Sequence, residues 1–97
     1  MQASGPATAE FETGLRRDGY QEVSRVEMKP GQHNPDHAHD FDAKALILAG
    51  DITITCGEEA RCYRAGDVFQ LAAGTPHVEQ IGGAGVSYLV GRRRKPA

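Results

Sequence analysis

The feature that most constrains the fold is a series of short, β-prone segments separated by glycine-containing turns. Between Tyr20 and Val90, runs rich in Val, Ile, Leu, Thr, Tyr and Phe alternate with Pro-Gly, Gly-Asp and Gly-Gly pairs. Short apolar or alternating runs bounded by such turn residues indicate strands. About seven strands at near-regular spacing predict an all-β sandwich or barrel. We find no sequence repeat and no linker that would divide it.

One short helix is expected before the strands. Phe11 and Leu15 are four residues apart, and Asp18-Gly19 supplies a stop signal, so the helix should run from Thr8 to this turn. Residues 1–7 are small and polar, and residues 92–97 are mostly basic. Both ends are expected to be disordered tails of a single domain, residues 1–97.

Composition excludes several classes of partner. The 11 basic and 13 acidic residues are interspersed and give a formal net charge of −2, which argues against a nucleic-acid surface. No apolar stretch is long enough to span a bilayer, and no export signal is visible, so we expect no membrane association and a cytoplasmic location. A chain of 97 residues buries only somewhat over ~60% of its unfolded surface, so a metal or a partner subunit would aid stability.

Two cysteines, Cys56 and Cys62, flank a turn-like segment, residues 57–61. They could face each other across a hairpin and form a disulfide. In a reducing cytoplasm, two thiols are the favoured interpretation.

Three of the four histidines form a pattern that indicates a metal site. His37 and His39 are two apart on an expected strand, so their imidazoles should point to one face. His77 ends a segment whose turn residues would fix its place on a neighbouring strand. The alternative is that the His-x-His pair is merely solvated in a loop. His33 is interpreted as a histidine at the rim.

These positions resemble the two sequence motifs of the cupin family. The first motif, Gly, five residues, His-x-His and a later Gly, is matched by Gly31, His37, His39 and Gly50. The second, Gly followed by a turn Gly and then His, is matched by Gly66, Gly74 and His77. The motif-bearing core is residues 31–81. The resemblance implies a double-stranded β-helix, a jelly-roll-like cupin barrel, with one short N-terminal helix.

The chain departs from the family pattern where a Glu ligand should follow the histidines. Counting back from Gly50 gives Ala43 for that position, and counting forward from His39 gives Lys44; neither can supply a carboxylate. We prefer Ala43, because the turn at Gly50 fixes the register of the strand before it. Asp42 is the nearest carboxylate and could swing inward as a substitute metal ligand, or it could cap backbone amides.

The resemblance implies one divalent transition metal bound by His37, His39 and His77. Three neutral imidazoles accept Zn, Fe, Ni, Mn or Cu, so the ligand set does not select the metal. Glu79 lies two residues beyond His77 and should share its interior face, where it could act as a general base. The alternative places Glu79 at the barrel mouth, exposed to solvent. Phe41, Phe69, Leu71 and Tyr88 fit ordinary core packing.

Three functions are compatible with these residues. One is a metal-dependent enzyme for a small molecule, such as a dioxygenase or isomerase. The second is a non-catalytic cupin module that binds or senses a ligand, and the third is a purely structural barrel, against which the intact histidines argue. We expect a small-molecule ligand and a homodimer, with residues 20–28 pairing or packing across the interface because open sheet edges are usually covered.

Overall fold

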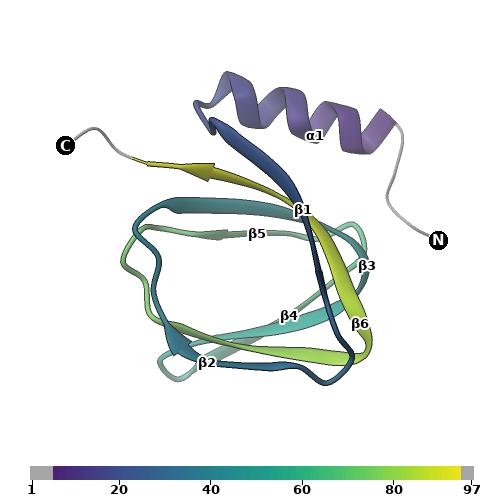
Figure 1. Ribbon diagram of the computed structural model, residues 1–97, viewed down its shortest axis with the longest axis vertical. Helices are drawn as coiled ribbons and strands as arrows, with labels where there is room; N and C mark the ends of the chain where they lie inside the picture. The colour runs from purple at the N-terminus through teal and green to yellow at the C-terminus, as the bar shows by residue number, and fades with distance from the viewer. Residues whose placement is uncertain (1–5, 95–97) are drawn as a thin grey trace.

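The computed structural model describes residues 6–94 and consists of one helix and six strands. The elements, in chain order, are α1 (Pro6–Arg17), β1 (Glu22–Met28), β2 (His33–His37), β3 (Asp42–Cys56), β4 (Glu59–Arg64), β5 (Val68–Leu71) and β6 (His77–Arg93). All strand pairs are antiparallel, in the order β1-β6-β3-β4, with β2 on β6 and β5 on β3. Figure 1 shows the strands wrapped into a barrel with α1 outside it. The all-β prediction with one N-terminal helix is confirmed.

Two long strands, β3 and β6, replace four of the short strands that the sequence predicts. Gly50 and the pair Gly82-Gly83 were expected to be turns between strands, but each lies inside a continuous strand. The register shifts on either side of Gly50, so this residue marks an irregularity where β3 bends. Gly50 has φ +74°, and a Cβ there would lie 1.9 Å from the carbonyl oxygen of Gly85. Only glycine fits this close approach of two backbones.

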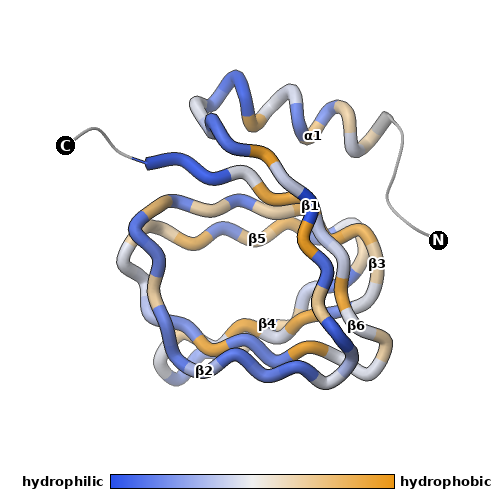
Figure 2. Tube along the Cα trace, in the orientation of Figure 1, coloured by the Kyte–Doolittle hydropathy of each residue, from blue (hydrophilic) through white to orange (hydrophobic). Residues whose placement is uncertain are grey.

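The apolar side chains form two clusters, one on each side of the sheet. The inner cluster lies inside the barrel and includes Ile47, Ile52 and Ile81, each at most 2% exposed. The outer cluster, Leu46, Leu48 and Leu89, packs against Phe11 of α1 and Val23 of β1. β2, with the sequence HNPDH, is largely hydrophilic (Figure 2). It therefore contributes polar groups to the barrel wall.

The chain ends differ from expectation. α1 begins at Pro6, before Thr8, where proline suits the first helical turn. β6 continues through Arg93, so the expected disordered tail from residue 92 is wrong for Arg92 and Arg93, which are held by strand pairing with β1 and β3. Residues 1–5 and 95–97 of the expected tails lie outside the described part of the chain.

The cysteines do not face each other. Cys56 is paired with Glu59 and Cys62 with Thr53 across the β3–β4 hairpin, and both are free thiols, as predicted. Among residues 6–94, no helix is long and apolar enough to cross a membrane.

Candidate metal centre

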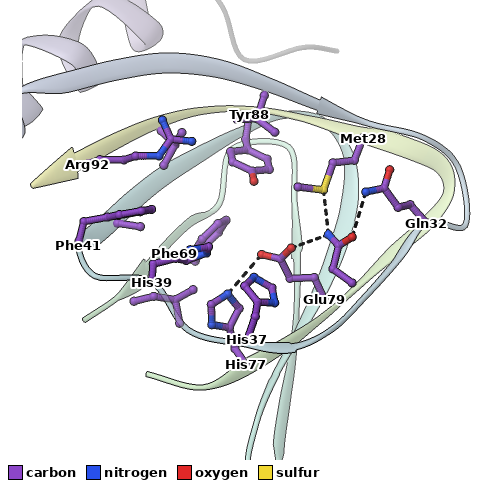
Figure 3. Close-up of a pocket in the computed structure, with 15 residues that line it drawn as sticks. Met28, Gln32, His37, His39, Phe41, Phe69, His77, Glu79, Tyr88 and Arg92 are labelled. Carbon is purple, nitrogen blue, oxygen red and sulfur yellow. Dashed lines mark hydrogen bonds and ion pairs between the residues drawn. The ribbon is translucent and has the colours of Figure 1, made fainter. Parts of the chain in front are cut away.

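The structure brings His37, His39 and His77 together on one wall of the barrel. Their ring centroids are 4.3 to 5.3 Å apart, and one ligand atom from each lies within 4.8 Å of the others. His37 ends β2 and is paired directly with His77, the first residue of β6. Figure 3 shows the rings pointing into a shared cavity. The three histidines therefore converge as the motifs predicted.

The His-x-His pair is not on one regular strand, however. The β2–β6 register shifts between Asn34 and His37, where Pro35 lacks the N–H that a strand ladder requires, and β2 ends at His37. His39 lies in the following loop. Its carbonyl accepts a hydrogen bond of 2.8 Å from the Gly74 N–H, which ties this loop to the turn before His77. Convergence thus depends on a contact between two loops as well as on strand alternation.

Hydrogen bonds to the backbone fix two of the imidazoles. His37 Nδ1 lies 2.7 Å from the Pro35 carbonyl oxygen, and His77 Nδ1 lies 2.9 Å from that of Thr75. A carbonyl can only accept, so each Nδ1 carries a proton, and in the neutral imidazole each Nε2 is left with its lone pair. His77 is 1% exposed, and its Nε2 has no hydrogen-bond partner within residues 6–94.

Glu79 is interior and lies beside His77. It is 6% exposed, and its Oε2 is 3.5 Å from His77 Nε2 without a hydrogen bond between them. Asn34 Nδ2 donates to Glu79 Oε1 at 2.7 Å, and Gln32 Nε2 donates to Asn34 Oδ1 at 3.0 Å. The interior alternative for Glu79 is therefore the observed one. Sequence reasoning missed Asn34 and Gln32, although their two-residue spacing was a signal for a shared face.

Asp42 does not join the histidines. Its carboxylate accepts hydrogen bonds from the Ala73 N–H at 2.9 Å and from the Arg93 guanidinium at 3.0 Å. Capping of a backbone amide, the alternative to metal ligation, is what the structure contains, and the expectation of a substitute ligand is corrected. Ala43 lines the cavity and Lys44 does not, so the count back from Gly50 gave the interior residue.

The cavity next to the histidines has a volume of about 340 Å³. Phe41, Phe69, Leu71 and Tyr88 line it while also packing in or against the inner cluster, so the expectation of plain core packing was incomplete. Arg92 also lines it (Figure 3). His33 lies outside, exposed, with its Nδ1 2.9 Å from Gln80 Oε1, as a rim histidine should.

The cavity changes the ionisation of two side chains. Burial, followed by the neighbouring His37 and His77, lowers the pKa of His39 below its usual 6.5, which favours the neutral ligand form. Burial, followed by the charge of Glu79, raises the pKa of Tyr88 to about 12. Tyr88 is therefore a neutral hydroxyl at physiological pH and can donate a hydrogen bond.

Known structures share this fold. A protein of unknown function from Rhizobium leguminosarum bv. viciae 3841 has a TM-score of 0.72 and 14% identity, covering 75% of this chain and 69% of that one. The DMSP lyase DddQ from Ruegeria pomeroyi DSS-3 has a TM-score of 0.67 and 28% identity, covering 73% of this chain but only 36% of the lyase. The conserved SPY1581 protein of unknown function from Streptococcus pyogenes has a TM-score of 0.67 and 24% identity, covering 77% of this chain and 65% of that one.

No curated protein matches the chain. The family model for the cupin domain matches residues 24–90, which is more than half of the sequence and contains the three histidines. The antiparallel barrel and its histidine-lined cavity agree with that match. The protein is thus a member of the cupin family.

Proposed function

We propose that this protein binds one divalent transition-metal ion through His37, His39 and His77 and takes a small organic ligand in the adjoining cavity. The observation that carries the proposal is the buried Nε2 of His77. This atom is shielded from water and faces the carboxylate of Glu79 at 3.5 Å, and in the neutral imidazole it has a lone pair. Two electron-rich atoms so placed are unfavourable unless a proton or a metal ion lies near both.

The donor set suits a metal ion. Imidazole nitrogens bind Zn, Fe, Ni and Mn, and ligating histidines commonly donate their other ring N–H to a backbone carbonyl. His37 and His77 have this second bond, to Pro35 and Thr75. His39 stacks on Phe41 at 4.7 Å, which limits rotation of its ring. The three imidazoles are therefore preoriented for a common ion.

The residues around the ion would determine the chemistry. A divalent ion held by neutral imidazoles supplies Lewis acidity to a bound ligand. Asn34 holds one oxygen of Glu79 and leaves the other oriented toward the histidines, so Glu79 can accept a proton from a ligand there. The Tyr88 hydroxyl can donate a hydrogen bond to the same ligand. Proton abstraction of this kind suits an isomerase, and a dioxygenase would require iron or another redox metal.

The second candidate function is a module that binds or senses the ligand without turnover. Ala43 favours it, since this residue leaves the histidines without the carboxylate ligand expected from β3. The two functions share every residue of the site except in the role of Glu79. Substitution of Glu79 therefore distinguishes them.

Metal analysis tests the proposal directly. Protein purified without an affinity tag or chelator should contain about one metal ion per chain by mass spectrometry of the digested sample. Each of H37A, H39A and H77A should lose most of the metal. The matched control is H33A, which removes an exposed histidine and should retain it. Stoichiometric metal in the triple alanine variant would place the site elsewhere.

We also propose that two copies associate through β1. This strand ends the sheet order and, within residues 6–94, pairs only with β6. An open edge of unpaired backbone groups is usually covered in a stable protein. Sedimentation equilibrium at micromolar concentration should give twice the 10.4 kDa chain mass; a single 10.4 kDa species would contradict the dimer.

A further inference from the structure

Arg92 lies in the cavity wall, although the sequence suggested a solvated tail. Residues two apart on a strand face the same side, and Tyr88, Val90 and Arg92 of β6 all line the cavity. Figure 3 shows the Arg92 side chain above Phe41. The guanidinium carbon is 5.5 Å from the Phe41 ring centroid, and the same ring stacks on His39 at 4.7 Å. Arg92 and one of the three histidines are therefore neighbours of one aromatic ring.

The charge of Arg92 has no carboxylate partner among residues 6–94. Its one hydrogen bond runs from Nη1 to the Ser24 hydroxyl at 2.8 Å, which orients the guanidinium without neutralising it. The other two arginines in the run differ. Arg93 is paired with Asp42, and Arg94 is paired with Glu22. Arg92 is thus the member of the run that brings an uncompensated charge to the cavity.

Opposite charges act on the cavity from two sides. Besides burial, the charge of Glu79 raises the pKa of Tyr88, while that of Arg92 lowers it. Figure 3 shows the Tyr88 side chain in the cavity, with Arg92 on one side of it and Glu79 on the other. A ligand beside Tyr88 would have a cation toward one end and the Glu79 carboxylate with the histidines toward the other.

We propose that Arg92 binds the carboxylate of a small, singly charged organic acid and directs the rest of that molecule toward the histidines. The inference rests on the proposed ligand-binding role of the cavity and specifies its ligand class. It assigns Arg92 as a ligand-binding residue and Ser24 as the residue that positions it.

The chemistry of the cavity selects this class. A guanidinium presents a planar fork that matches a carboxylate with two hydrogen bonds. A dianion such as a phosphate would be less favourable, because the cavity has one free cation among residues 6–94 and also contains the Glu79 carboxylate. The side chains of Val26, Leu71 and Val90 supply an apolar part of the wall. A volume of about 340 Å³ is at the small end for ligand sites, so the acid should have a short aliphatic chain.

The test uses the full chain, freed of metal so that a carboxylate cannot bind through the ion. Butyrate and butyramide, which has a similar shape and no charge, are titrated separately while amide NMR shifts are followed at fixed ionic strength. Butyrate should give saturable shifts in the cavity and bind at least about tenfold more tightly than butyramide. Inorganic phosphate should bind more weakly than butyrate.

Variants locate the binding group. R92Q should weaken butyrate about tenfold or more and leave butyramide unchanged, and S24A should weaken butyrate by a smaller factor. The matched control is R25Q, which removes the same charge from an exposed residue on the other face of β1 and should stay within about twofold of the original protein. If R92Q fails to fold, phenylglyoxal modification of the original protein replaces it: butyrate should slow modification of Arg92 and not of Arg25.

Three results would overturn the proposal. The first is that butyrate and butyramide bind with equal affinity, or that neither binds. The second is that R92Q binds butyrate as tightly as the original protein. The third is that R25Q loses as much butyrate affinity as R92Q. In the modification experiment, equal protection of the two arginines has the same meaning. Butyrate binding through Arg92 in a protein that never takes metal would contradict only the metal proposal. If the protein binds metal and Arg92 has no part in binding butyrate, only the proposal for Arg92 is contradicted.

Discussion

Two buried carboxylates, Asp42 and Glu79, are held in opposite ways. Asp42 is 8% exposed and receives a backbone N–H and an arginine, so its charge is compensated. Glu79 is 6% exposed and receives one neutral amide, from Asn34, while its other oxygen lies 3.5 Å from His77 Nε2. Buried charges are costly unless compensated. The first carboxylate therefore stabilises the fold, and the second has the features of a functional group.

The largest expected difference between the two carboxylates is in turnover, which should depend on Glu79. E79Q keeps the shape of the side chain and removes its basicity, so an enzyme should retain metal and ligand yet lose roughly 10² to 10⁴ in kcat. The measurement is steady-state kinetics with a substrate found by screening small carboxylic acids. N34A, which removes the bond that holds Glu79, should cost less. An E79Q variant with undiminished turnover would rule out Glu79 as the base, and one that merely binds ligand as before fits the sensing module.

Metal should stabilise the folded chain by binding to the histidines beside Glu79, and it should not bind near Asp42. With free metal about a thousandfold above its Kd, the expected gain is about 4 kcal/mol in the free energy of unfolding. H77A should abolish the gain, whereas H33A should retain it. Thermal unfolding with and without added Zn²⁺ measures both. Equal stabilisation of H77A and the original protein would place the ion elsewhere.

The Asp42 region should matter more for stability in the absence of metal. D42A removes an acceptor for the Ala73 N–H and for Arg93, and a hydrogen bond to a charged group contributes about 1.5 to 3 kcal/mol, so a loss of about 2 kcal/mol is expected. E79Q in metal-free protein should change stability by less than about 0.5 kcal/mol or raise it, since a buried charge is removed. Urea unfolding compares the two. If E79Q destabilised the protein as much as D42A, the claim that Asp42 stabilises the fold and Glu79 does not would be wrong.

Sequence patterns predicted the Glu79 region better than the Asp42 region. His77 and Glu79 share a face through two-residue alternation, and the motifs supplied His37 and His39. Such signals are local or belong to a family pattern.

The partners of Asp42 lie 31 and 51 residues away, and only the folded sheet brings them together. Arg92 was missed for the same reason, because its place in the wall depends on strand pairing with β1 and on Ser24. The two long strands were missed because a glycine can bend a strand without ending it, and the sequence pattern is the same in both cases.

The smallest expected effect concerns Tyr88, whose pKa is raised to about 12 by burial and then by Glu79. Removing the Glu79 charge makes ionisation of the phenol easier, so E79Q should lower the Tyr88 pKa. D42N should leave it unchanged, because Asp42 is not among the causes of the shift. The raised pKa favours the folded state below about pH 10, and this contribution is lost as the pH rises toward 12. The Cζ chemical shift of Tyr88 in metal-free protein follows its titration. A shift of that titration in D42N but not in E79Q would mean that the wrong carboxylate has been placed beside the cavity.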